Sequence, residues 1–225
     1  MRFIPFVVTA VMLIPGSAGA QWRNPFTGNT FNNPISSSLD TMILHSMQQR
    51  MLQQSVQARQ QGTAKTAKPK HVPLAKTDFK PPEKGHPVVK AFLDAAAPKA
   101  DERKQFQKAI DETFGIVEKS LRKNNVATAF GLAIGTALEI VTGKESSEEA
   151  DKELIAGIND QLVAAPEFAK LAAKDKQTLN DTLVLTGALM IILHTAGQSD
   201  PAMKEASVSL AKAVLTQLTG SATAS

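Results

Sequence analysis

Hydrophobic residues recur at helical spacing through most of the chain after residue 86. Between Asp101 and Lys123 the apolar positions are three or four residues apart and form one helix face. Similar spacing predicts further helices over 87–97, 126–141, the stretch from Ser146 to Pro166, 178–196 and 201–218, with a short turn or helix over 166–173. No segment alternates with a sustained period of two, so no sheet is predicted. The pattern predicts an all-α fold, a single helical bundle of about six helices over residues 86–220.

Residues that begin and end helices support these boundaries. Ser146, with Glu149 three positions later, forms a capping-box pattern for a helix N-terminus. Asp200 followed by Pro201 suits an N-cap and the first position of the last helix. Gly143 ends an apolar stretch, as expected of a helix C-terminus.

The most apolar stretch, Leu183–Leu193, is expected to be the central helix of the bundle. Its eleven residues form about 16 Å of helix, roughly half of a hydrocarbon core, so no transmembrane span is predicted. Gly131 and Gly135 form a GxxxG pattern, which allows another helix backbone to approach closely. We expect these glycines to pack against Leu183–Leu193.

A separate Met- and Gln-rich segment, residues 38–61, precedes the bundle. Apolar residues recur in it at intervals of four, at Leu39, Ile43, Met47 and Met51. This spacing predicts an amphipathic helix, which can pack on the bundle, pair with another chain or lie on a membrane. Methionine side chains adapt to different surfaces, so the candidate residues for a protein partner or self-association are Met42, Met47 and Met51.

Basic residues are concentrated in a Lys/Pro-rich linker, residues 62–85. Residues 21–100 carry 11 Lys and Arg against 4 Asp and Glu, whereas residues 101–225 carry 13 against 17. The linker is either a solvated spacer or an attachment to an anionic envelope polymer through Lys65, Lys68 and Lys70. No Arg cluster or aromatic stacking residue accompanies the lysines, so specific nucleic-acid binding is not predicted.

The first twenty residues have the pattern of a signal peptide. Arg2 precedes an apolar stretch from Phe3 to Pro15, and Ala18 and Ala20 match the small-residue cleavage site. Cleavage would leave a secreted or periplasmic protein beginning at Gln21. Residues 21–37 are expected to be irregular, and residues 221–225 a disordered tail.

The sequence contains little that suggests catalysis. It has no Cys, which excludes thiol nucleophiles and thiolate metal sites, and it lacks the common nucleotide, zinc-protease and serine-hydrolase motifs. No cofactor or metal is predicted. Glu139 is the one weak catalytic candidate, either an exposed or boundary carboxylate or a general acid paired with Asp181 or Asp111.

The four histidines are scattered rather than spaced as ligands. His194, near the end of a predicted helix, is expected to be favoured as a cation by the helix dipole. His71 and His86, with Asp78 and Glu83, would form a metal site only if the linker were prearranged.

Three stretches carry a resemblance to a known family. They are NNVATAFGLAIGTALEIVTGKESSEE, QTLNDTLVLTGALMIILHTAGQSDP and the final LTQLTG. Over about residues 78–220 the chain resembles a family of secreted, all-helical bacterial proteins known as a domain of unknown function. The resemblance implies export and a single helical domain, and it assigns no activity.

These features together predict an exported, non-enzymatic helical protein that binds a macromolecular partner or supports a cell-envelope assembly. Two alternatives remain open. One is a glycan-cleaving or lytic enzyme that uses Glu139, and the other is a membrane-interacting helical protein.

Overall fold

The structure, a computed structural model, describes residues 70–96 and 100–219. Over these residues it contains seven α-helices, one 3-10 helix and no strand, with an isolated antiparallel bridge between Asp78 and Asn125. The predicted all-α fold is confirmed. The expectations for the signal peptide, residues 21–69 and the C-terminal tail fall outside the described residues.

The helices lie close to where the hydrophobic spacing predicts them. In chain order they are η2 (Leu74–Thr77), α2 (Pro87–Ala96), α3 (Ala100–Ser120), α4 (Val126–Thr142), α5 (Glu148–Ala164), α6 (Pro166–Lys170), α7 (Ala173–Ala196) and α8 (Pro201–Thr219). The short element expected over 166–173 is α6. The helix α7 begins five residues before the predicted position 178, because its first turn is polar and largely exposed and adds nothing to the apolar pattern.

Helix ends follow local chemistry, with one correction. Asn125 caps α4 by accepting a hydrogen bond from the Thr128 backbone N–H at 2.9 Å, and Gly143 ends α4 in the left-handed region at φ 66°. The predicted capping box of Ser146 and Glu149 is not formed, because the N-cap is Ser147, which accepts from the N–H of Ala150, a residue with no side-chain group to bond back. The Ser146 side chain is therefore available to other partners.

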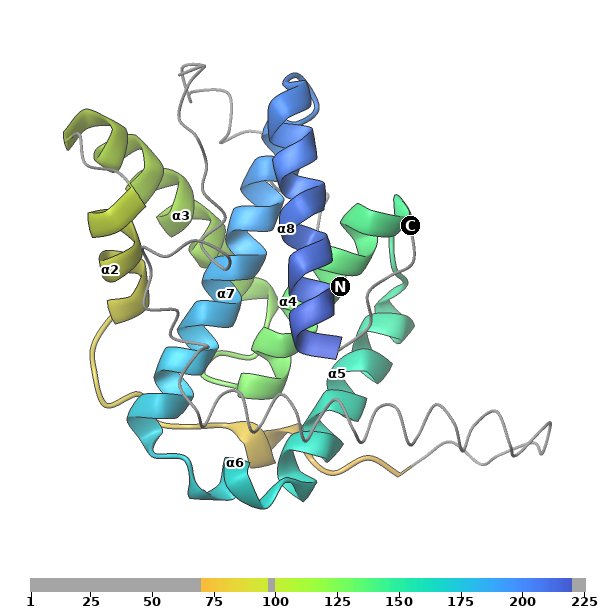
Figure 1. The fold of residues 1–225 in the computed structure, drawn as a ribbon. Coiled ribbons are helices and arrows are strands. Elements are labelled where there is room, and N and C mark those ends of the chain that lie inside the picture. Colours follow the sequence, from red (N-terminus) through yellow and green to blue (C-terminus); the bar gives the residue numbers. More distant parts are fainter. Residues whose placement is uncertain (1–69, 97–99, 220–225) are drawn as a thin grey trace.

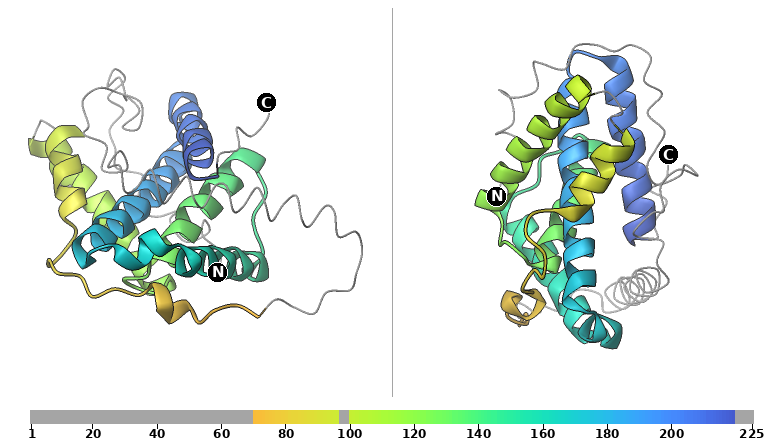
Figure 2. Two further views of the ribbon diagram at one scale, coloured as in Figure 1. Left: turned by 60° about the horizontal axis from the view of Figure 1, so that its bottom comes forward. Right: turned by 90° about the vertical axis from the view of Figure 1, so that its left-hand side faces the viewer.

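The core is built around α7, which runs through the middle of the bundle (Figures 1 and 2). It packs against α2 and α3 on one side and against α4 and α8 on the other. Every residue from Leu179 to Leu193 is buried, as predicted for the stretch Leu183–Leu193. A helix surrounded by neighbours can be apolar on all faces, which is why α7 lacks a polar stripe.

In length and composition, α7 could also cross a membrane. Its most apolar window has a mean hydropathy of 1.4, and 83% of that window is buried inside the bundle. The same apolar surface that would face lipid is occupied here by α2, α3, α4 and α8.

Small residues allow close helix packing at positions different from those predicted. The site of a Cβ on Gly131 is occupied by Ile155 of α5, not by α7. The close approach between α4 and α7 is instead made by Gly187, where an added Cβ would lie 2.8 Å from Leu132 Cγ. A GxxxG pattern identifies a close contact but not the helix that makes it.

Residues 70–86 lie along the bundle and are called here the N-terminal strap. Asn125 donates through Nδ2 to the Leu74 carbonyl at 2.9 Å, and Asn159 donates to the Val72 carbonyl at 2.9 Å. Thr77 is fully buried and donates to Asn159 Oδ1 at 2.9 Å. Its Lys- and Pro-rich composition predicted a linker. In the structure, side chains of the helices bind its backbone carbonyl groups and hold it against the bundle.

Candidate functional site

Apart from the possible partners of Glu139 and the set around His71 and His86, which are described below, two of the predicted site residues lie in the described part of the chain. Lys70 is exposed at the start of the strap, and Glu139 lies near the end of α4. The other candidates fall outside the described residues: Met42, Met47, Met51, Lys65, Lys68 and the cleavage-site residues Ala18 and Ala20.

Glu139 is buried, not exposed or at a boundary as its helical position suggested. Its side chain is 6% exposed, because α5 follows α4 through a short loop that covers this face. Ser146 in that loop donates from its backbone N–H and from Oγ to Glu139 Oε1, each at 2.9 Å. The same Oγ lies 2.5 Å from Oδ1 of Asp151, which is 3% exposed. Two buried carboxyl groups therefore share one hydroxyl.

The shared hydroxyl determines how protons are arranged in this cluster. A serine hydroxyl carries one proton and cannot donate to two carboxylates at once. Burial raises the pKa of Asp151, against the hydrogen bond from Ser146, which lowers it. A protonated Asp151 can donate to Ser146 Oγ while Ser146 donates to Glu139. Glu139 Oε2 and Asp151 Oδ2 are buried without a hydrogen-bond partner among the described residues.

His194 of α7 lies at the same end of the bundle. Its expected character as a cation is not found, because burial lowers the pKa of His194 and the nearby Lys204 lowers it further, while Glu139 acts in the opposite direction. His194 is thus a neutral neighbour of the Glu139 cluster near neutral pH.

Asp181 and Asp111 do not join Glu139. His194 lies near Glu139, whereas Asp181 lies thirteen residues earlier on α7, about 20 Å away at 1.5 Å per residue. Asp181 is 2% exposed, and its Oδ1 lies 3.3 Å from Nδ1 of His86 at the end of the strap. Asp111, on the exposed side of α3, acts electrostatically on the same histidine. The predicted carboxylate pairs are therefore not formed.

His86 connects the strap to two helices. Its Nδ1 faces Asp181 of α7 and its Nε2 lies 3.3 Å from Glu118 Oε1 of α3. The ring packs on Phe114 with the centroids 4.7 Å apart. The hydrogen bond to Asp181 raises the pKa of His86, against desolvation of the ring. Only the doubly protonated ring can donate to both carboxylates.

His71 makes the equivalent attachment at the other end of the strap. Its Nδ1 lies 2.7 Å from Asp160 Oδ2 and its Nε2 lies 3.1 Å from Glu153 Oε2, both on α5. Hydrogen bonds to Asp160 and then to Glu153 raise the pKa of His71. Each end of the strap is therefore held by one imidazole between two carboxylates.

The histidines do not form the metal site considered from the sequence. The other two residues of that set pair elsewhere: Asp78 with Arg122 at 2.5 Å and Glu83 with Lys174 at 3.3 Å. The Arg122 hydrogen bond lowers the pKa of Asp78. Across residues 70–96 and 100–219, no group of three or more His, Asp or Glu has the geometry of a metal site.

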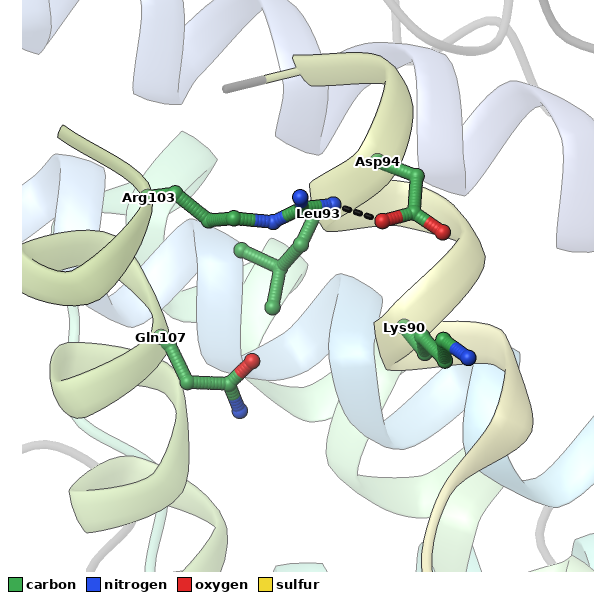
Figure 3. A pocket seen from close by; sticks show the side chains of 5 residues that line it. All are labelled: Lys90, Leu93, Asp94, Arg103 and Gln107. Atoms are coloured by element: carbon green, nitrogen blue, oxygen red, sulfur yellow. Dashed lines mark ion pairs between the residues drawn. The ribbon is translucent and has the colours of Figure 1, made fainter. Parts of the chain in front are cut away.

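Two small cavities lie away from Glu139. One, of about 200 Å³, lies between α2 and α3 and is lined by Lys90, Leu93, Asp94, Arg103 and Gln107. Figure 3 shows Arg103 and Asp94 facing each other across it as an ion pair. The other, of about 220 Å³, lies between the strap and α5 and has a largely apolar lining.

Comparison with known proteins places the chain in a sequence family. The family described as "Family of unknown function (DUF6683)" matches residues 6–223. The chain belongs to this family. The DUF6683 match begins well before residue 78, so residues 38–69 and the strap lie within the family sequence as well as the bundle. No curated protein and no solved structure matches the chain.

Sequence reasoning missed the two histidine attachments and the pairing of Glu139 with Asp151. The position of Glu139 inside an apolar helix was a usable signal that it has a buried partner. The attachments connect residues between 32 positions apart (His86 with Glu118) and 95 positions apart (His86 with Asp181), and local spacing contains no sign of them.

Proposed function

We propose that this protein is an exported, non-enzymatic helical protein, secreted or periplasmic after cleavage of the signal peptide. Residues 38–69, called here the N-terminal arm, bind a macromolecular partner or support a cell-envelope assembly. The bundle serves as the rigid body from which the arm is presented.

The observation that carries this proposal is the attachment of the strap. Contacts from α5, from α7 and from the connection between α3 and α4 hold residues 71–86, so the chain that follows the arm is fixed to the bundle. Such an arrangement suits an arm that presents methionine and lysine side chains to a partner. The family match, which includes the arm, also supports a role beyond that of a spacer.

The arm can be tested with two matched variants of the mature chain. One replaces Met42, Met47 and Met51 with Ser, and the other replaces Lys65, Lys68 and Lys70 with Ser. Each is used to capture partners from a solubilised envelope fraction, with circular dichroism as the control for folding. We expect the methionine variant to lose a specific protein partner, and the lysine variant to lose salt-sensitive binding to anionic polymer.

The proposal would be contradicted if both variants captured the same material as the unchanged protein. Deletion of residues 38–61 provides a second check. If the deletion unfolds the bundle, the segment belongs to the core and the arm has no independent role.

Glycan cleavage is a second candidate function, favoured by the presence of Asp151 beside Glu139. Glycosidases use two carboxyl groups near the scissile bond, one of them with a raised pKa. Purified protein would be incubated with peptidoglycan and the released fragments measured. Turnover that is lost in Glu139→Gln would replace our proposal with this one.

A further inference from the structure

The cavity between the strap and α5 is lined by apolar side chains that no other described residue fully covers. Its apolar lining comes from the strap, from the residue that follows α3 and from α5: Val72, Leu74, Leu121, Ile155 and Ala156. All five side chains remain partly exposed. Figure 2 shows the strap crossing beside α5. We call this surface the strap groove.

The lining residues of α5 follow about two turns of the helix. They run from Lys152 to Asn159, a rise of about 10 Å at 1.5 Å per residue. The strap groove is therefore long enough to contact more than one turn of an incoming helix.

The charges at the edge of the strap groove are already neutralised. Arg122 pairs with Asp78 at 2.5 Å, and Lys152 pairs with Glu148 at 2.8 Å. An anionic ligand would have to break these pairs. An uncharged apolar occupant would not, so the groove favours an apolar side-chain stripe bordered by neutral polar residues.

The chain contains such a stripe close to the groove. The described chain begins at Lys70, two residues before the lining residue Val72. Residues 38–61 carry apolar side chains at intervals of four, including Ile43, Met47 and Met51, and their polar positions are mostly Gln and Ser. The eight residues 62–69 reach at most about 28 Å, and α5 is about 25 Å long. The segment can therefore turn back over the groove.

We propose that residues 38–61 dock in the strap groove of their own chain, with Met47 and Met51 on the apolar lining. The short connection gives the segment an effective concentration in the millimolar range, which favours its own groove over that of another molecule. This inference goes beyond the proposed function: a partner that binds Met47 and Met51 would have to displace the segment from its own groove.

Disulfide trapping tests the docking cleanly, because the chain has no Cys of its own. Two double variants of the mature protein combine Ala156→Cys with Met47→Cys or with Met51→Cys. The matched controls are Ala156→Cys with Gln49→Cys, which lies on the opposite helix face, and Met47→Cys with Thr216→Cys on α8. Oxidation is followed on non-reducing gels, and the linked peptides are identified by mass spectrometry.

We expect the test pairs to form an intramolecular disulfide in the monomer about tenfold faster than either control. Equal rates for test and control pairs would overturn the docking. A disulfide formed between two chains would also overturn it, in favour of a second copy as the occupant. Neither result would depend on the identity of an external partner.

Discussion

At the residue scale, the hydroxyl of Ser146 explains why a glutamate is tolerated inside an apolar helix. Glu139 and Asp151 come from different helices and meet at one serine, with Oγ distances of 2.9 and 2.5 Å. An isolated buried carboxylate would be costly, whereas one that accepts two hydrogen bonds is partly compensated. The cluster therefore joins the end of α4 to the start of α5.

The raised pKa of Asp151 predicts how stability depends on pH. The folded state holds this proton more tightly than the unfolded state, whose ordinary value is about 3.9. The contribution of Asp151 to stability is therefore present below that value and is lost as pH rises through the raised pKa. Asp151→Asn keeps a donor for Ser146 Oγ and removes the ionisation.

Urea unfolding at pH 4 and pH 7 measures this effect. Between pH 4 and pH 7 the free energy of unfolding should fall less in Asp151→Asn than in the unchanged protein. At pH 7 the variant should be at least as stable as the unchanged protein. The control Ser147→Ala removes the N-cap of α5 and should cost about 1 kcal/mol at both pH values. Strong destabilisation of Asp151→Asn at pH 7 would show that the ionised form is the stabilising one.

Close packing at Gly197 gives a second prediction at this scale. A Cβ added there would lie 2.7 Å from Lys204 Cα, a backbone atom that cannot move easily. Gly197→Ala should therefore destabilise the protein by about 1–3 kcal/mol. Gly157→Ala, in α5 with nothing within 4 Å of the added atom, should be neutral or slightly stabilising. Thermal melting of both variants checks the contrast, and equal effects would contradict it.

At the element scale, the strap is held by polar contacts along its length and by one histidine near each end. His71 faces Asp160 and Glu153 on α5. His86 faces Asp181 and Glu118, with Asp111 acting on it from a greater distance. Both pKa values are raised, so the attachments contribute fully below the unfolded value of about 6.5 and weaken as pH rises through the raised values.

The strap should therefore open more often at alkaline pH. Trypsin cleavage after the exposed residues Lys76 and Lys84, normalised to an unstructured peptide, should be about tenfold faster at pH 9 than at pH 6. In the double variant His71→Gln, His86→Gln, cleavage should be fast at both pH values. His194→Gln is the control and should retain the difference, because His194 lies outside the strap.

Cleavage of the strap that stays equally slow at pH 6 and pH 9 would mean that the asparagine contacts in its middle hold it without the histidines. Asn125 and Asn159 together bind the Leu74 and Val72 carbonyls. These contacts carry no titratable group.

At the scale of the whole molecule, the apolar helix α7 raises the question of membrane insertion. Its apolar face is already covered by α2, α3, α4 and α8. Insertion together with α4 would place Glu139 in lipid, at a cost of roughly 2.5 kcal/mol or more for a charged form. The closed bundle, in which α7 is covered by other helices, is therefore favoured over insertion into lipid.

We therefore predict no dye release when the mature protein is added to liposomes at neutral pH. Binding to anionic vesicles through the lysines of the arm is expected to disappear at high salt. The Lys65, Lys68, Lys70→Ser variant is the control for that binding. Dye release that persists in high salt would contradict the closed bundle.

The helical fold class and most helix boundaries could be predicted from local sequence, because helical periodicity, caps and glycine stops act within a few residues. The burial of Glu139, the contact of Gly131 with α5 and the pairing of His71 and His86 with carboxylates far along the chain could not. These outcomes depend on which helices become neighbours. The hydrophobic pattern of one helix predicts which of its faces will be buried. The packing of the helices decides which residues cover that face, and these neighbours determine the burial and the pKa of its polar side chains.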